Sequence, residues 1–404
     1  MYIKRSLESK VRYLSEHFPV VMVCGARQVG KTTMLKRIAE SDKTIQYVTL
    51  DYPILRKLAR EDPELFLQQY NAPLIIDEIQ YAPELLPFIK IRVDEKNENG
   101  MYYLTGSQMF HLMSNVSESL AGRVGVLEMF SLSLAEIEGR DDVPFNPANI
   151  SNFHSSDTIN AVFDRILRGG MPRLVSDIEM SSEDFYSSYI QTYIERDIRD
   201  IIHIKNENKF INFISCVAAR VSQEVNLTDI AKDVEIDKKT AEGWLSVLVS
   251  SGIVFLLNSY SSNIIKRIVK RPKLYFMDTG LACYLSRWNN ARSLEISAMS
   301  GAMFENYVIS EIIKSYTNNG IDTKSRLAYY RDNNGKEIDL LIMENGKIYP
   351  VEIKKSADPG QSALKNFSVL ESFHEEVGEG AVLCMISQVV PLDARNKLTP
   401  IKAV

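Results

Sequence analysis

The sequence predicts a multidomain α/β protein that begins with a doubly wound parallel sheet. Short apolar runs occupy residues 19–24, 45–50, 74–76 and 101–104, and stretches of helical character lie between them. Wholly apolar runs of this length are typical of strands that are buried on both faces of a parallel sheet. Because strands and helices alternate, we expect helices on both faces of the sheet. We place this first domain at residues 1–140.

The composition is that of a globular chain with more than one domain. Of the 404 residues, 45% are hydrophobic and 25% are charged, and the formal net charge is −5. These values exclude a mainly disordered chain and a polybasic protein. The cysteines are few and have no CxxC or CxxH spacing, so we expect neither a disulfide framework nor a zinc site.

The N-terminus carries no apolar run that would make an export signal. No apolar stretch approaches the roughly 20 residues that span a bilayer. We therefore expect a cytoplasmic protein without a membrane partner.

Beyond the first domain, the pattern predicts three further parts. Residues 155–215 are expected to form a helical lid or connector, which a Gly-Gly-Met-Pro breaker interrupts at residues 169–172. In residues 216–265, two helical stretches are separated by a three-residue turn and followed by an apolar strand. This order predicts a winged-helix-like module. After a basic connector, residues 270–404 are expected to form a last α/β domain.

A phosphate-binding motif follows the first apolar run. Residues 25–32 match G-x-x-x-x-G-K-[ST] between a strand and a helix, which is the context that the motif requires. The glycines let the backbone curl so that successive N–H groups point at one centre, and the helix adds its positive N-terminal end. We therefore expect this loop to bind ATP. The expected binding residues are Gly25, Ala26, Arg27, Gln28, Val29, Gly30, Lys31, Thr32 and Thr33.

The expected chemistry is phosphoryl transfer to water. Lys31 is expected to reach the β- and γ-phosphates, and the Thr32 hydroxyl to bind Mg²⁺. A later apolar strand ends in Asp77 and Glu78. We expect Asp77 to hold the Mg²⁺ through a water and Glu78 to orient and polarise the attacking water. A glutamate beside the magnesium aspartate predicts hydrolysis rather than nucleotide sensing alone.

Two further residues are candidates for the catalytic site. Ser107 follows the next strand and is expected to bond the γ-phosphate or the attacking water, unless it belongs to an ordinary strand-to-helix turn. Arg123 is a candidate for the cation that stabilises transition-state charge, in cis or from a neighbouring subunit. The alternative for Arg123 is an ordinary surface arginine.

Four motifs together resemble a known family: GARQVGKTT, LIIDEIQ, YLTGSQ and AGRV. They are similar to the N-terminal half of a bacterial and archaeal family of AAA+/ASCE-type P-loop ATPases, whose C-terminal half is nuclease-like. The breaker at residues 169–172 and the segment YIERDIRD at residues 193–200 also resemble family features. The resemblance implies ATP and Mg²⁺ as cofactors. ATPases of this kind often share sites across an interface, so a homo-oligomer is expected.

A second group of acids lies near the C-terminus. Asp339 is on one expected strand, and Glu352 and Lys354 share one face of the next because side chains alternate along a strand. A hairpin would bring Asp339 beside Glu352, and paired carboxylates suit a hard divalent cation. This pattern resembles the PD-(D/E)xK core of a restriction-endonuclease-like domain.

By that resemblance, Asp339, Glu352 and Glu305 would hold a second Mg²⁺ or Mn²⁺, and Lys354 would be the nuclease-like catalytic residue. The alternative is a half-exposed strand with a rim of salt bridges. Folds of this class also persist as inert nucleic-acid platforms, so cleavage stays open.

The winged-helix-like module, the basic connector and the nuclease-like domain make DNA the expected macromolecular partner. The connector carries Lys266, Arg267, Lys270, Arg271 and Lys273. The expected recognition helix is of mixed charge, with Lys238 and Lys239 near Glu242, so a structural hinge is the alternative.

The sequence thus predicts a Mg²⁺-dependent AAA+-type ATPase whose hydrolysis is coupled to a DNA-handling C-terminal module. One alternative is a regulatory nucleotide switch whose C-terminal domain only mediates protein interaction. Another is a nuclease in which ATP only permits DNA cleavage.

Overall fold

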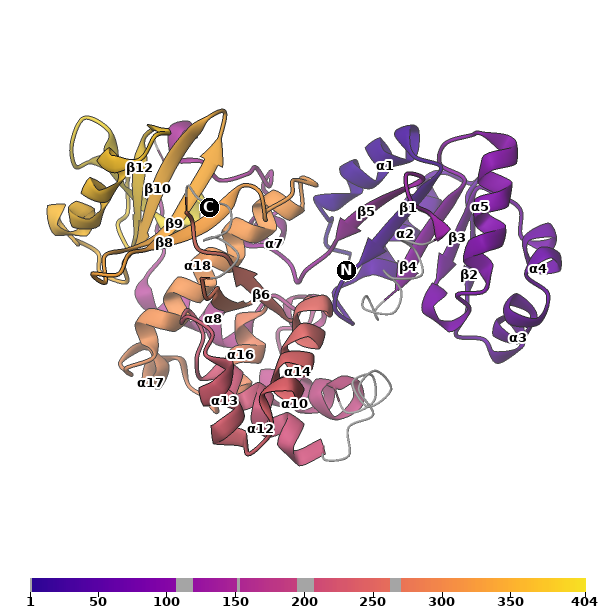
Figure 1. Cartoon of the computed structure of the whole chain (residues 1–404), viewed down its shortest axis with the longest axis horizontal. Coiled ribbons are helices and arrows are strands. Elements are labelled where there is room, and N and C mark those ends of the chain that lie inside the picture. The colour runs from indigo at the N-terminus through magenta and orange to yellow at the C-terminus, as the bar shows by residue number, and fades with distance from the viewer. Residues whose placement is uncertain (1, 107–118, 151–152, 195–206, 262–269) are drawn as a thin grey trace.

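The computed structural model describes residues 2–106, 119–150, 153–194, 207–261 and 270–404. Figure 1 shows an N-terminal α/β domain beside a second body that contains the central helices and the C-terminal sheet. The predictions that concern Ser107, Lys266, Arg267 and residues 195–200 fall outside the described residues.

The N-terminal domain alternates strands and helices as the sequence predicts, with one strand, β5, that was not predicted. Its strands are β1 (Val20–Cys24), β2 (Gln46–Thr49), β3 (Leu74–Asp77), β4 (Tyr102–Gly106) and β5 (Val124–Glu128). Its helices are α1 (Leu7–His17), α2 (Lys31–Ser41), α3 (Pro53–Glu61), α4 (Pro63–Gln69) and α5 (Leu85–Lys96), with the 3-10 turn η1 (Ile79–Tyr81). The described strands are all parallel in the order β2-β3-β4-β1-β5, which confirms the predicted parallel sheet.

The central strand β1 shows why this sheet needs helices on both faces. All five of its residues are buried, and their side chains alternate between two hydrophobic clusters. Val21 and Val23 pack with residues of α1 and α2, whereas Val20, Met22 and Cys24 pack with residues of α4 and α5. The sheet is therefore covered on both sides, as its apolar runs predict.

The middle of the chain is mostly helical. Its elements are η2 (Pro147–Asn149), α8 (Ile159–Arg168), α9 (Pro172–Ser176), α10 (Ser182–Tyr189), the π-helical turn η3 (Ile190–Ile194), α12 (Glu207–Ala218), α13 (Leu227–Val234), α14 (Lys238–Ser250), β6 (Val254–Leu257), β7 (Lys273–Phe276), α16 (Thr279–Leu285) and α17 (Ala291–Glu295). α13 and α14 lie where the sequence predicts two helices, and β6 pairs antiparallel with β7 after them. The assignment of this module as a winged helix stays a prediction.

The C-terminal part joins a long helix to a mixed sheet. Its elements are α18 (Ser300–Thr317), β8 (Leu327–Arg331), β9 (Glu337–Glu344), β10 (Lys347–Ile353), the 3-10 segment η4 (Gln361–Ser372), β11 (Glu376–Val377), β12 (Gly380–Cys384), β13 (Val390–Pro391), β14 (Asn396–Pro400) and η5 (Ile401–Ala403). β8, β9 and β10 are antiparallel neighbours, and β10, β12 and β14 are parallel neighbours. The predicted hairpin between β9 and β10 is present.

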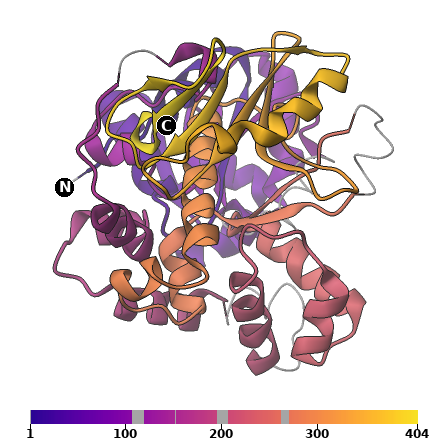
Figure 2. The ribbon, with the colours of Figure 1, turned by 90° about the vertical axis from the view of Figure 1, so that its left-hand side faces the viewer.

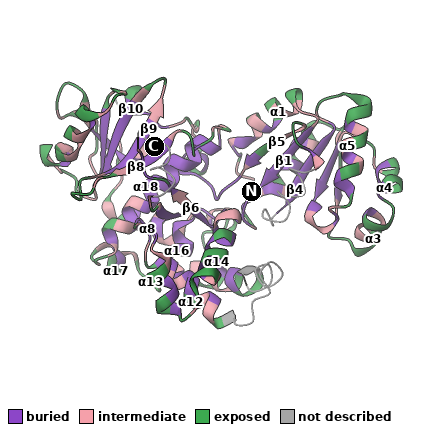
Figure 3. Cartoon of the chain, in the orientation of Figure 1, coloured by how far each residue is buried: buried purple, intermediate pink, exposed green. Residues whose placement is uncertain are grey.

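Helix α18 lies between the C-terminal sheet and the central helices (Figure 2), and nearly all of its residues are buried (Figure 3). Asn306 of this helix is fully buried and bonds the backbone of β7 twice. Its Oδ1 accepts from the Phe276 N–H at 2.7 Å, and its Nδ2 donates to the Phe276 carbonyl at 3.0 Å. Asn306 therefore satisfies the backbone of β7 as a neighbouring strand would.

One segment connects the N-terminal sheet to everything that follows. This connecting segment, residues 129–136, runs from the end of β5 into helix α7 (Leu134–Glu138). The Met129 N–H donates to the Cys24 carbonyl at 2.8 Å, and the Leu132 N–H donates to the Gly170 carbonyl at 2.8 Å. The Gly-Gly breaker predicted from the sequence thus packs against the connecting segment.

This packing makes Gly170 a sensitive position. A Cβ at residue 170 would lie 2.5 Å from the carbonyl oxygen of Leu132, a backbone atom that cannot swing away. We expect Gly170→Ala to destabilise the protein by about 1–3 kcal/mol, the usual cost of overpacking a dense interior. A lower midpoint of urea unfolding, followed by circular dichroism, would show this.

Gly243→Ala is the matched control. Gly243 is exposed within α14, and a Cβ there would meet nothing within 4 Å. This substitution should stabilise the helix by about 0.5–1 kcal/mol. If both variants unfolded at the same midpoint, the steric argument would be wrong.

Candidate functional site

The phosphate-binding loop lies between β1 and α2, at the carboxyl edge of the parallel sheet. Gly30 is the N-cap of α2, with a φ of 99°, and Gly25 has a φ of 140°. A Cβ on Gly25 would lie 2.0 Å from the Met129 carbonyl oxygen, so only glycine fits between the loop and the connecting segment. The first turn of α2 has no side-chain cap, which leaves its N–H groups available to an anion.

Lys31 is folded back onto the loop. Its Nζ donates to the carbonyls of Gly25 at 2.8 Å and Ala26 at 2.7 Å, and 6% of the residue is exposed. Burial lowers the pKa of Lys31 to about 8, although Glu78 and Asp77 act in the opposite direction. The neutral carbonyls replace only part of the hydration that the buried ammonium loses. A negatively charged phosphate would therefore be a better partner for Lys31.

Asp77 is the last residue of β3, and its carboxylate is hydrogen-bonded to three hydroxyl groups. Thr32 Oγ1 lies 2.9 and 3.1 Å from the two carboxylate oxygens, which brings together the two residues predicted to bind Mg²⁺. Tyr47 donates to Oδ2 at 2.8 Å, and Thr105 donates to Oδ1. Sequence reasoning gave neither Tyr47 nor Thr105 a role, although both are on strands that flank β3. An oxygen-only group of this kind fits a hard cation such as Mg²⁺.

Glu78 follows Asp77 and turns out of the strand with a φ of 59°. Its N–H donates to Thr105 Oγ1 at 3.3 Å, and the Gln80 side chain donates to its carboxylate. Burial raises the pKa of Glu78, which makes this carboxylate a better proton acceptor than an exposed one. The structure therefore places the predicted base next to the predicted magnesium ligand.

Arg123 is at the other edge of the sheet. It precedes β5, whose residue Val124 pairs with Val20 at the start of β1, whereas Glu128 pairs with Cys24 beside the loop. Four residues of strand separate these ends, roughly 13 Å. The Arg123 guanidinium forms an ion pair with Asp94, with Nε at 2.5 Å from Oδ1. The structure thus does not bring Arg123 to the loop of its own chain, and a role in a neighbouring subunit stays a prediction.

The C-terminal acids surround a lysine that the sequence placed in the basic connector. Lys273 starts β7 and is 3% exposed. It is therefore not available to bind DNA, contrary to what the basic connector predicts. Its Nζ lies 3.0 Å from Glu305, 2.5 Å from Glu337 and 4.0 Å from Asp339. Burial alone would lower the pKa of Lys273, but the surrounding carboxylates outweigh it and raise this pKa.

The acidic cluster is completed by Glu352 on β10 and by Lys354, the residue that follows β10. Lys354 Nζ donates to Glu352 Oε1 at 2.6 Å, and the Ile353 N–H donates to Asp339 Oδ2 at 2.8 Å. The second oxygen of Glu352 is buried without a hydrogen-bond partner. Burial raises the pKa of Glu352 to about 8, and neighbouring Asp339 adds to this effect. The pKa of Glu305 rises to about 7 for the same two reasons.

The predicted nuclease-like residues thus lie in one cluster, with Lys273 in contact with three of its carboxylates. In the part of the chain that the structure describes, no group of three or more His, Cys, Asp or Glu residues is arranged to hold a metal ion. The described helices also include none with the length and apolar character that a bilayer crossing requires.

Three parts of the chain match protein-family models. Residues 17–138 match the model of an AAA domain. These residues include the phosphate-binding loop, Asp77 and Glu78. Residues 159–292 and 300–404 match two domains of unknown function, DUF8612 and DUF4143.

Relatives of similar sequence include uncharacterized proteins of Mycobacterium tuberculosis and Mycobacterium bovis. Each is 27% identical over 363 residues, which cover 89% of this chain and 75% of the relative. Similar solved structures include a Walker-type ATPase of Pyrococcus abyssi, with 14% identity and a TM-score of 0.46 over 70% of this chain and 96% of that one. RuvB T158V of Thermotoga maritima has 18% identity and a TM-score of 0.31 over 62% and 88%. Similarity this distant does not extend to activity.

The lowered pKa of Lys31 predicts proton uptake on ATP binding. Above pH 8 the free lysine is largely neutral, and a bound phosphate would raise its pKa and recharge it. ATP affinity should therefore fall as the pH rises through this value. Calorimetry in buffers of different ionisation enthalpy should detect uptake of a proton one pH unit above it and much less one unit below.

Lys31→Arg is the control, because a guanidinium stays charged across this range and cannot take up the proton. If the wild-type protein took up equal numbers of protons at both pH values, Lys31 would not be the titrating group.

Proposed function

We propose that this protein is a Mg²⁺-dependent ATPase whose hydrolysis is coupled to a DNA-handling C-terminal module. The observation that carries the ATPase is the contact of Thr32 with Asp77 at the mouth of the loop, with Glu78 beside it. The AAA-type match of residues 17–138 supports the same activity.

The residues present fit the cofactor that an ATPase of this type needs. Thr32 and Asp77 would hold Mg²⁺, which supplies positive charge to the phosphate oxygens when bound. On binding ATP, the Lys31 ammonium exchanges the carbonyls of Gly25 and Ala26 for phosphate oxygens. This exchange is favourable because a charged acceptor is a stronger partner than a neutral carbonyl.

Glu78 acts as the general base. Its raised pKa suits a base that accepts a proton from water as the water attacks the γ-phosphate. Gln80 donates to the Glu78 carboxylate and so orients it. The positive φ of Glu78 turns this side chain away from the direction of β3, beside Asp77 rather than in line with the strand.

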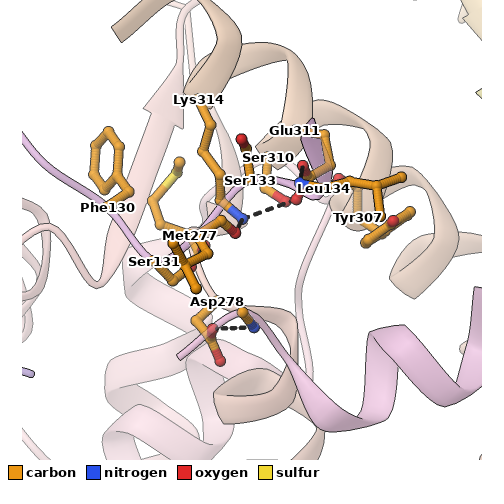
Figure 4. Close-up of polar contacts among 12 residues, drawn as sticks. Phe130, Ser131, Ser133, Leu134, Met277, Asp278, Tyr307, Ser310, Glu311 and Lys314 are labelled. Atoms are coloured by element: carbon orange, nitrogen blue, oxygen red, sulfur yellow. Dashed lines mark hydrogen bonds and ion pairs between the residues drawn. The ribbon is translucent and has the colours of Figure 1, made fainter. Parts of the chain in front are cut away.

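The connecting segment supports coupling between the two halves of the molecule. Ser131 Oγ donates to the Met277 carbonyl at 3.0 Å, directly after β7. The Leu134 N–H donates to Glu311 Oε2 at 2.7 Å, and Lys314 Nζ donates to the Leu132 carbonyl at 3.2 Å. Figure 4 shows Ser131 and Leu134 of the segment with Met277, Glu311 and Lys314 around them. The same β7 and α18 carry Lys273 and Glu305 of the acidic cluster, so a shift of the loop has a short path to that cluster.

The test of the ATPase uses two substitutions with different expected defects. Lys31→Ala should abolish ATP turnover and weaken binding, because it removes the cation of the loop. Glu78→Gln should keep ATP binding but lower turnover by at least about 100-fold, the usual weight of a general base. Phosphate release and calorimetry would measure the two properties, with and without single- and double-stranded DNA.

Stimulation of turnover by DNA would support coupling to a DNA-handling module. Unchanged turnover in both variants would refute the ATPase. A regulatory switch without DNA would instead show no salt-dependent DNA retention in any nucleotide state.

A second candidate activity is metal-dependent cleavage of DNA by the acidic cluster. The unpaired, buried oxygen of Glu352 favours it, because such an oxygen is costly unless a cation or proton occupies it. Asp339, Glu352 and Glu305 would hold a second Mg²⁺ or Mn²⁺, and Lys354 would position the water. Lys273 would have to give up its place among the carboxylates for this ion to enter.

Cleavage should require Mg²⁺ or Mn²⁺ and should disappear in Asp339→Ala and in Lys354→Ala. Lys347→Ala is the matched control, since this lysine begins β10, the strand that Lys354 follows, but forms an exposed ion pair with Glu376. Gel assays on plasmid and oligonucleotide DNA, with and without ATP, would measure the cutting. A wild-type protein that turns over ATP but cuts no DNA under any of these conditions would refute the nuclease.

A further inference from the structure

Arg5 is a buried cation with no assigned role. It precedes α1, outside the residues that match the AAA domain, and only 3% of it is exposed. An arginine is rarely buried to this extent, because taking its charge out of water is costly unless every donor finds an acceptor. Its surroundings therefore indicate what holds it in place.

The Arg5 guanidinium bridges the phosphate-binding loop and the connecting segment. Nη1 donates to the carbonyl of Val29 in the loop at 2.6 Å. Nη2 donates to the carbonyl of Phe130 in the connecting segment at 2.9 Å. Nε donates to Glu136 Oε1 at 2.9 Å, and the Glu136 side chain is fully buried. All three nitrogens of the fork are thus engaged.

We propose that Arg5 is a positioning residue for nucleotide binding, which fixes the Val29–Gly30 peptide so that the Gly30 N–H faces the phosphates. In a trans peptide, the carbonyl and the following N–H point in opposite directions. With the Val29 carbonyl held by Arg5, the Gly30 N–H must point away from Arg5. This inference rests on the proposed ATP site and adds a residue to it.

The local backbone needs such a fixed point. Gly30 has a φ of 99°, a conformation that glycine adopts readily but that glycine also leaves readily. Nη1 of Arg5 lies 3.8 Å from where a Gly30 Cβ would be, so the guanidinium packs directly against this residue. A loop that is already ordered does not lose that conformational entropy when the anion binds.

The contribution of Arg5 is orientation rather than charge. Glu136 pairs with Arg5 inside the protein, so the pair as a whole carries no net charge toward the phosphates. Glu136 is itself held, because its Oε1 also accepts the Ser6 N–H at 2.8 Å and its Oε2 accepts the Ser133 N–H at 3.0 Å. The guanidinium is therefore a rigid support behind the loop.

The same support joins the loop to the connecting segment. One planar group holds the carbonyls of Val29 and Phe130, so the two backbones cannot move independently while both bonds persist. A change in the loop on nucleotide binding would therefore also move the connecting segment, which reaches β7 and α18.

The experiment uses two variants of Arg5 in the full chain. Arg5→Lys keeps a cation for Glu136, but one ammonium cannot span three acceptors. Arg5→Met combined with Glu136→Met removes both charges and keeps the packed volume, a change that proteins often tolerate without loss of stability. Arg165→Met is the matched control, because it removes an arginine of α8 that is paired with Asp157.

The first readout is hydrogen exchange of residues 24–31 without nucleotide, which does not depend on ATPase activity. Exchange should be faster in both Arg5 variants than in the wild type and unchanged in Arg165→Met. The second readout is ATP binding by calorimetry. Both Arg5 variants should bind ATP about 10- to 100-fold more weakly, the equivalent of losing hydrogen bonds to a charged group.

Unchanged exchange in a folded Arg5 variant would overturn the inference, whatever its ATP affinity. Faster exchange with wild-type ATP affinity would overturn it as well, because the loop would then not need Arg5 to bind. A wild-type protein that binds no ATP would refute the proposed function itself, and this outcome is recognised without any variant.

Discussion

The arrangement of this molecule depends on satisfying the buried backbone of the connecting segment. A buried N–H or carbonyl without a partner costs about 1–3 kcal/mol, so each such group must find one. The segment draws its partners from regions far apart in the sequence. Phe130 is held by Arg5, Leu132 by Gly170, and Leu134 by Glu311. These bonds, together with a hydrophobic cluster that runs through both parts, fix the N-terminal α/β domain against the central helices and α18.

Much of the N-terminal half could be predicted because its signals are local. The phosphate-binding loop is contiguous, and the strand that ends in Asp77, with Glu78 after it, is marked by an uninterrupted apolar run. The rest depends on contacts between distant residues, which leave no local pattern. Arg5 and Glu136 are 131 positions apart, and Leu134 and Glu311 are 177 positions apart.

Two basic residues lie in surroundings that the local sequence does not indicate. Lys273 belongs to the basic connector that favours DNA as a partner, but it is buried because carboxylates from α18 and β9 surround it. These carboxylates are distant from Lys273 in the sequence. Arg123 is a candidate cation in cis or from a neighbouring subunit, or else a surface arginine. It precedes β5, which runs parallel to β1, and this places it at the opposite edge of the sheet from the loop of its own chain. In both cases the sequence shows the type of residue but not the distant residues that surround it.

Two buried lysines show how the surroundings set the behaviour of one side chain. Lys31 contacts neutral carbonyls and its pKa falls, whereas Lys273 contacts carboxylates and its pKa rises. The first is ready to exchange partners, and the second is held firmly. Because Lys273 supplies a positive charge from within the chain, Glu305, Glu337 and Asp339 do not require an external ion in order to be enclosed. The enclosure of these three carboxylates therefore does not depend on a bound divalent metal, unlike that of small domains whose folded state is created by the ion they bind.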